Sequence, residues 1–150
     1  MKLAENGKRI GAFLIDIIPI TGIVFIIFYY FFGFKELMND YYSDKGNIEL
    51  RYEFLKNRGM IRNISMLIYI LVGIFLDAST IQGSFGKMIM KIKIVDFNEN
   101  RISLKTSIIR NISKIISALP ISIGFIWGLF DKKRQTWHDK IAKTLVAERN

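Results

Sequence analysis

The chain has 150 residues, of which 51% are hydrophobic and 23% are charged, and its formal net charge is +9 at pH 7. The apolar residues collect in three blocks with the charges between them, which is typical of a small polytopic membrane protein and excludes a nucleic-acid-binding domain, the usual alternative for a basic chain. There is no cysteine, so disulfides, thiol catalysis, zinc–cysteine sites and iron–sulfur clusters are excluded.

The first apolar segment, residues 10–34, contains a single ionisable side chain, Asp16. At 1.5 Å per residue this segment is long enough to cross a hydrocarbon core of about 30 Å. A carboxylate at membrane depth costs about 2.5–3.5 kcal/mol on insertion scales, so Asp16 needs a partner or a proton. Arg9, seven residues earlier, lies on the same helix face. Pro19 leaves the carbonyl of Ile15 without its helical donor, which gives either a tolerated kink or a polar notch beside Asp16.

The middle of the chain is predicted to be a polar loop followed by a second helix. Residues 35–63 are rich in charges of both signs, and we expect them to be exposed. Residues 64–81 are apolar and long enough to span, with Asp77 near the end of the segment, where an acid meets water.

A basic extended segment, residues 82–103, is expected to follow on the cytoplasmic side. Apolar residues and lysines alternate from Met90 to Ile94, which is the period of a strand. Residues 97–100 form a turn signal, and residues 101–104 could be the return strand of a hairpin.

The third apolar block is ambiguous. Residues 104–114 predict an amphipathic helix lying in the membrane interface, because three basic side chains share one face. These are Lys105, Arg110 and Lys114. Residues 115–130 are apolar but short and contain Pro120, so they form either a re-entrant hairpin broken at Pro120 or the end of a full span. We favour a third spanning helix, because the backbone of a re-entrant loop must be buried in protein.

The basic tail, residues 131–150, contains the only histidine, His138. Such a histidine is most often a packing or capping residue, and the alternative is that it titrates with the adjacent Asp139.

Four motifs occur in a recognisable order. They are Arg9-x2-Ala12-x-Leu14-x-Asp16, Gly83-Ser84-Phe85-Gly86-Lys87-x5-Lys93-Ile94-Val95-Asp96, Arg101-Ile102-Ser103-x6-Arg110-Asn111 and Trp137-His138-Asp139-x2-Ala142-x-Thr144-x-Val146. Together they resemble the RDD family of small bacterial membrane proteins over nearly the whole chain. Ser84 stands where threonine is usual, and Trp137 where leucine is usual before the His-Asp pair.

The resemblance implies three membrane helices and a poorly defined role in transport, without a substrate. The arginine of the family name maps onto Arg9, its first aspartate onto Asp16 and its second onto Asp139, with Asp77 and Asp131 as alternatives.

The sequence thus predicts an all-α, multi-pass protein of the cell membrane that forms a single domain. It would have about three transmembrane helices, an interfacial amphipathic helix and a short β-like hairpin on the cytoplasmic side. We expect partners to be anionic lipid headgroups and either further copies of the chain or another membrane protein, and not nucleic acid. No cofactor or metal site is predicted.

Two functions remain open, and the family resemblance favours the first. The first is transport of a monovalent cation or a proton through Asp16, since oxygen ligands at membrane depth suit hard cations and proton relays. The alternative is a non-transporting scaffold or accessory subunit, in which the charged cluster of Arg9, Asp16 and Asp139 locks the fold. A glycine stripe in the first helix would then dock a partner; it comprises Gly11, Gly22 and Gly33. Further candidate members of the cluster are Asp77, His138 and Arg110. An enzyme is not predicted, because the chain has no serine-nucleophile elbow and no phosphate-binding glycine loop.

Overall fold

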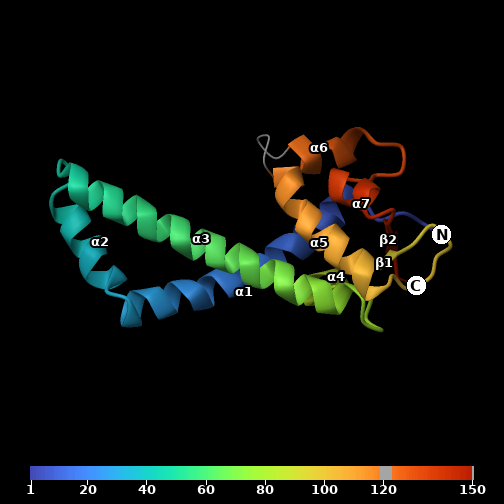
Figure 1. Cartoon of the computed structure of the whole chain (residues 1–150), viewed down its shortest axis with the longest axis horizontal. Coiled ribbons are helices and arrows are strands. Elements are labelled where there is room, and N and C mark those ends of the chain that lie inside the picture. The colour runs from blue at the N-terminus through green and yellow to red at the C-terminus, as the bar shows by residue number, and fades with distance from the viewer. Residues whose placement is uncertain (119–122, 150) are drawn as a thin grey trace. The chain divides into compact units, whose positions relative to one another are not determined.

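The computed structural model describes residues 1–118 and 123–149. Its elements are α1 (Asn6–Phe31), α2 (Phe34–Ser43), α3 (Ile48–Asp77), α4 (Phe85–Ile89), β1 (Ile92–Val95), α5 (Leu104–Ala118), α6 (Ile123–Phe130), α7 (Trp137–Ile141) and β2 (Leu145–Glu148) (Figure 1). The chain forms two compact units. We call Ile17–Tyr69 the helical unit, and Met1–Asp16 with Ile70–Asn150 the network unit.

The helical unit has an aromatic core. Its buried apolar side chains come from all three of its helices: Val24, Phe28, Phe34, Phe54 and Ile61. The rings of Phe34 and Phe54 stack at 5.7 Å between centroids, and those of Tyr41 and Phe54 at 4.3 Å. Gly33 separates α1 from α2 with φ of 67°, a left-handed conformation that glycine adopts without strain.

The loop predicted for residues 35–63 is wrong, because α2 and the first half of α3 occupy it. Helix α1 ends at Phe31 rather than at residue 34, and α3 runs from Ile48 to Asp77 rather than over 64–81. The charges in this stretch concealed an apolar stripe, in which Phe54 and Ile61 are seven residues apart and both buried. That spacing brings two side chains to one face of a helix. Gly33 falls outside α1, so the predicted glycine stripe is not continuous.

The predicted hairpin is also wrong in its partner. Strand β1 pairs antiparallel with β2 from the tail, with Ile92 opposite Glu148 and Val95 opposite Leu145. A turn does follow β1, since the Asp96 carboxylate accepts the backbone N–H groups of Asn98 and Asn100 at 2.8 Å each. Pairing with the tail strand is favoured over pairing with residues 101–104, because the tail strand buries three consecutive side chains in the core. These are Leu145, Val146 and Ala147.

Within the part of the chain that the structure describes, two helices are long and apolar enough to cross a membrane, namely α1 and α3. Only 11% and 28% of their apolar windows are buried, whereas the core helix of a soluble protein is mostly covered. The third spanning helix is not confirmed, because α5 ends at Ala118 and α6 has only eight residues. Pro120, where we placed the possible break, lies outside the described residues.

Helix α5 shows the reverse of the expected amphipathic arrangement. An interfacial helix directs its basic face toward water. Lys105 is exposed, as that arrangement requires, but Arg110 and Lys114 are only 2% and 3% exposed. Its outward face is apolar and is formed by Ile108, Ile109, Ile112, Ile115 and Ile116. In this part of the network unit, α5 therefore directs charged side chains into the interior and isoleucine side chains to the outer surface.

Candidate functional site: a buried charged network

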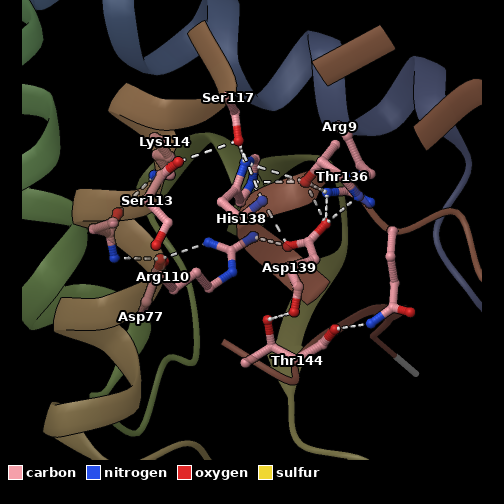
Figure 2. A network of polar contacts seen from close by, with 12 residues as sticks. Arg9, Asp77, Arg110, Ser113, Lys114, Ser117, Thr136, His138, Asp139 and Thr144 are labelled. Carbon is pink, nitrogen blue, oxygen red and sulfur yellow. Dashed lines mark hydrogen bonds and ion pairs between the residues drawn. The ribbon is translucent and has the colours of Figure 1, made fainter. Parts of the chain in front are cut away.

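Asp139, in α7, is the centre of the site and has no exposed surface. Its Oδ1 accepts a hydrogen bond from Arg110 Nη2 at 2.8 Å, and its Oδ2 forms an ion pair with Arg9 Nη2. Thr136, the N-cap of α7, donates to the same Oδ2 from its backbone N at 3.0 Å and from Oγ1 at 2.7 Å. Asp139 thus joins α1, α5 and the start of α7 through one carboxylate, as Figure 2 shows.

Asp77, the last residue of α3, is a second buried carboxylate, and Arg110 bridges it to Asp139. Arg110 Nη1 donates to Asp77 Oδ2 at 3.0 Å, and Asn111 Nδ2 donates to the same oxygen at 3.1 Å. Lys87 Nζ, from α4, donates to Asp77 Oδ1 at 3.1 Å. A planar guanidinium that holds two carboxylates fixes their separation and orientation, so Arg110 determines the distance between α3 and α7.

Asp16 ends the network on the other side. Its Oδ1 accepts the backbone N–H of Gly86 at 2.7 Å, and its Oδ2 accepts the hydroxyl of Ser84. Lys87 Nζ in turn lies 3.3 Å from Ser84 Oγ. Hydrogen bonds therefore connect the two charged positions of α1: they run from Asp16 through Ser84, Lys87, Asp77, Arg110 and Asp139 to Arg9.

Close backbone approach brings α4 onto α1. A Cβ placed on Gly86 would lie 2.1 Å from the carbonyl oxygen of Ala12, far inside van der Waals contact. The Gly83-to-Lys87 segment has a glycine at this point because only the absence of a side chain lets the Gly86 N–H reach Asp16. Gly73 of α3 likewise allows α5 to approach closely, since a Cβ placed on Gly73 would lie 2.5 Å from Asn111 Oδ1.

Burial lowers the pKa of His138 well below its ordinary value of 6.5, although the neighbouring Asp139 charge opposes this. The imidazole is therefore neutral at pH 7 and packs against hydroxyls, with Thr136 Oγ1 2.9 Å from Nε2 and Ser117 Oγ 3.2 Å from Nδ1. For Asp139, burial raises the carboxyl pKa, but the charges of Arg9 and Arg110 outweigh it and hold the pKa well below its ordinary range. His138 is thus a packing residue, and Asp139 is an anion.

The charges nearly balance within the network. The cations Arg9, Lys87 and Arg110 stand against the anions Asp16, Asp77 and Asp139. Lys114 Nζ donates to Asn111 Oδ1 at 2.6 Å, and burial lowers the pKa of Lys114 well below its ordinary value of 10.5. Buried charge is tolerated only when it is paired and hydrogen-bonded. In the described residues no group of three histidine, cysteine, aspartate or glutamate side chains could hold a metal ion.

The structure brings Arg9 and Asp139 into direct contact, but it places Asp16 with Ser84 and Gly86 instead. Asp131, the other alternative for the second aspartate, pairs with Lys140 at the surface at 2.5 Å. Which aspartate is the second of the family stays a prediction.

Sequence reasoning missed several buried polar members of α5, although a signal was present. The polar residues of α5 recur at the spacing of one helix face and are all at most 3% exposed: Ser107, Arg110, Asn111, Lys114 and Ser117. We interpreted the charged members of this stripe as a solvated face. The isoleucines on the opposite face indicate that the stripe faces inward.

Exposed apolar helices combined with an enclosed charged network are characteristic of helical membrane proteins, in which ionisable groups face the protein interior. Residues 3–143 match the RDD family, so the chain belongs to this family. The resemblance seen in the four motifs is thereby confirmed.

Three relatives illustrate the similarity. The chain is 37% identical to the uncharacterized protein YxaI of Bacillus subtilis over 86 residues, which are 55% of this chain and 56% of that protein. It is 37% identical to a proline-rich antigen homolog of Mycobacterium tuberculosis over 67 residues, 44% of this chain and 28% of that protein. It is 36% identical to a proline-rich antigen of Mycobacterium leprae over 63 residues, 41% of this chain and 25% of that protein. The matches thus span from a quarter to about half the length of these relatives. No solved structure matches the chain significantly.

Proposed function

We propose that this RDD-family chain is a non-transporting scaffold or accessory subunit of the cell membrane, and that its charged network is a structural lock. The observation that carries the proposal is the saturation of Asp139. Its carboxylate is fully buried, forms ion pairs with Arg9 and Arg110, and accepts hydrogen bonds from the backbone N–H and the hydroxyl of Thr136. A carboxylate with this many fixed donors is poorly suited to binding and releasing an ion during transport.

The same pattern holds at Asp77, whose carboxylate accepts hydrogen bonds from Lys87, Arg110 and Asn111. Removing one partner from such a network leaves an uncompensated buried charge and costs about 3–5 kcal/mol. The network therefore acts as a single unit that holds α1, α3, α4, α5 and α7 of the network unit together. In this proposal the partners are further copies of the chain or another membrane protein, and no catalysis is assigned.

The test measures how much folded protein accumulates in the membrane. Arg9→Ala removes one of the two arginines on Asp139, and we expect loss of folded protein in the membrane, measured by size-exclusion chromatography of detergent extracts. Arg9→Lys keeps the charge without the planar fork and should fold partially. Arg101→Ala, at an exposed arginine, is the matched control and should accumulate normally. A fully folded and abundant Arg9→Ala protein would contradict the structural lock.

A second candidate, transport of a proton or a monovalent cation, is favoured by Asp16. This carboxylate lies within an apolar helix, is only half-buried, and accepts hydrogen bonds from Ser84 and Gly86 rather than from a formal charge. In proteoliposomes loaded with a pH-sensitive dye, the scaffold proposal expects no flux above protein-free vesicles. Flux that disappears in a folded Asp16→Asn variant would establish transport and overturn the scaffold proposal.

A further inference from the structure

A cavity of about 540 Å³ opens in the network unit between the end of α6, the connection that follows it, and α7. Three lysines line it together with two aromatic rings and one carboxylate. They are Lys132, Lys133, Lys140, Trp127, Phe130 and Asp131. The network does not use these residues.

The cavity carries a net positive charge. Its carboxylate, Asp131, is already paired with Lys140 at 2.5 Å and accepts the backbone N–H groups of Lys133 and Gln135 at 3.1 Å each. Asp131 thus shapes the connecting loop and neutralises one lysine, which leaves Lys132 and Lys133 as the charge available to a ligand. Both lysines are exposed. The cavity is therefore complementary to an anion.

The aromatic side of the cavity is exposed as well. Phe130 is 81% exposed and Trp127 is 45% exposed, and the adjacent Leu129 is 57% exposed. Lys140 Nζ lies 5.3 Å from the centre of the Trp127 ring and Lys133 Nζ 4.9 Å from that of Phe97, so the lysines lie beside ring faces. Tryptophan next to lysine is typical of the membrane–water boundary, where the ring meets acyl chains and the ammonium meets headgroups.

We propose that this cavity binds the headgroup of an anionic phospholipid. The phosphate lies against Lys132 and Lys133, and Trp127 and Phe130 contact the glycerol and the upper part of the acyl chains. A soluble phosphate would use the lysines but would leave the two exposed rings without a partner, so the lipid explains both halves of the cavity. This site is independent of whether the chain transports anything.

The chain supplies its own probe, because it has two tryptophans and one of them lines the cavity. In a Trp137→Phe background, the remaining Trp127 fluorescence is measured in nanodiscs that contain brominated phosphatidylglycerol or brominated phosphatidylcholine at equal mole fraction. We expect stronger quenching by the anionic lipid, with a relative association constant raised about fivefold for each lysine that contributes. The preference should fall toward one in Lys132→Gln/Lys133→Gln.

The control is Lys45→Gln/Lys56→Gln, which removes the same charge from exposed positions in the helical unit and should keep the preference. Native mass spectrometry of the otherwise unchanged chain gives a second measurement that does not depend on Trp137→Phe, and it should show retained phosphatidylglycerol that the double variant in the cavity loses. Equal quenching by both lipids, or a preference that survives Lys132→Gln/Lys133→Gln, would overturn the proposal. Abolition of the preference by added inorganic phosphate would assign the cavity to a soluble anion and also overturn it.

Discussion

The two units of this chain hold themselves together by opposite means. The helical unit packs aromatic and aliphatic side chains, and the hydroxyl of its buried Ser65 donates to the Ile61 carbonyl of its own helix at 2.7 Å. The network unit buries carboxylates, guanidiniums and ammoniums, and it exposes a face of isoleucines on α5. The interior of the first unit is apolar, whereas the second unit combines small apolar clusters around β1 and β2 with a charged network.

The difference follows from what surrounds each helix. Lipid chains are as apolar as leucine, so apolar burial gives little drive for helices to associate in a membrane, and polar contacts supply part of it. Short elements such as α4 and α7 bury too little surface to hold by packing alone, and the network fixes their positions. The long helices of the helical unit have enough length for aromatic stacking to suffice. Four experiments test this contrast, from the largest expected effect to the smallest.

The largest effect is expected for Asp139→Asn, which leaves Arg9 and Arg110 facing a neutral amide in a buried site. We expect a loss of about 3–5 kcal/mol in the free energy of unfolding, measured by thermal unfolding in detergent. Asp131→Asn changes a carboxylate at the surface that pairs with Lys140, and should change the unfolding temperature far less. Equal effects of the two substitutions would show that burial of charge does not distinguish the network.

Gly86→Ala tests the close contact between α4 and α1. The new methyl group would overlap the Ala12 carbonyl oxygen, so the backbone must separate and the Gly86 N–H must leave Asp16. We expect a loss of about 1–3 kcal/mol. Gly59→Ala in α3 meets nothing within 4 Å and should stabilise by up to about 1 kcal/mol through helix propensity. Destabilisation by Gly59→Ala as large as that by Gly86→Ala would remove the distinction.

His138 makes the stability of the network unit depend on pH. Because its folded pKa lies well below the ordinary value of 6.5, the unfolded chain takes up a proton that the folded chain excludes as the pH falls below 6.5. The stability is therefore complete above that pH and falls below it, by about 1.4 kcal/mol per pH unit. His138→Gln should flatten this dependence between pH 6.5 and pH 5 in thermal unfolding measurements. The contribution of Asp139 is lost in a separate window, which begins at its ordinary pKa of 3.8 and extends to lower pH, because its folded pKa lies well below that value. An unchanged slope in His138→Gln would show that another group titrates.

The smallest effect compares two serines. Ser84, the N-cap of α4, connects Asp16 of α1 to Lys87 of α4, so Ser84→Ala should cost about 0.5–1.5 kcal/mol for the hydrogen bonds that it removes. Ser65 donates to the Ile61 carbonyl of its own helix, and Ser65→Ala should be within about 0.5 kcal/mol of neutral. Hydrogen exchange of the backbone amides in and around α4 measures the local effect of each substitution. Protection lost equally in both variants would contradict the assignment of Ser84 to the network.

The sequence predicted the two long helices, the charged positions of α1 and the family. An uninterrupted apolar run is a local property that reflects the length of a span directly. It did not predict α2 and the start of α3, because their charges concealed a stripe in which Phe54 and Ile61 face inward. For α5 the helical period was recognised, but not which face is inside. Periodicity gives two faces and does not say which one meets the rest of the protein.

Taken alone, the sequence determined that Arg9 and Asp16 lie on α1 and that Asp139 follows His138 near the end of the chain. Only the tertiary structure decided that Asp139 pairs with Arg9 and that Asp16 accepts hydrogen bonds from Ser84 and Gly86. It also decided that β1 pairs with the tail strand. These contacts join residues 50 to 130 positions apart. Local propensity and spacing carry no information over such separations, because the partner of a buried charge is selected by the packing of every element around it.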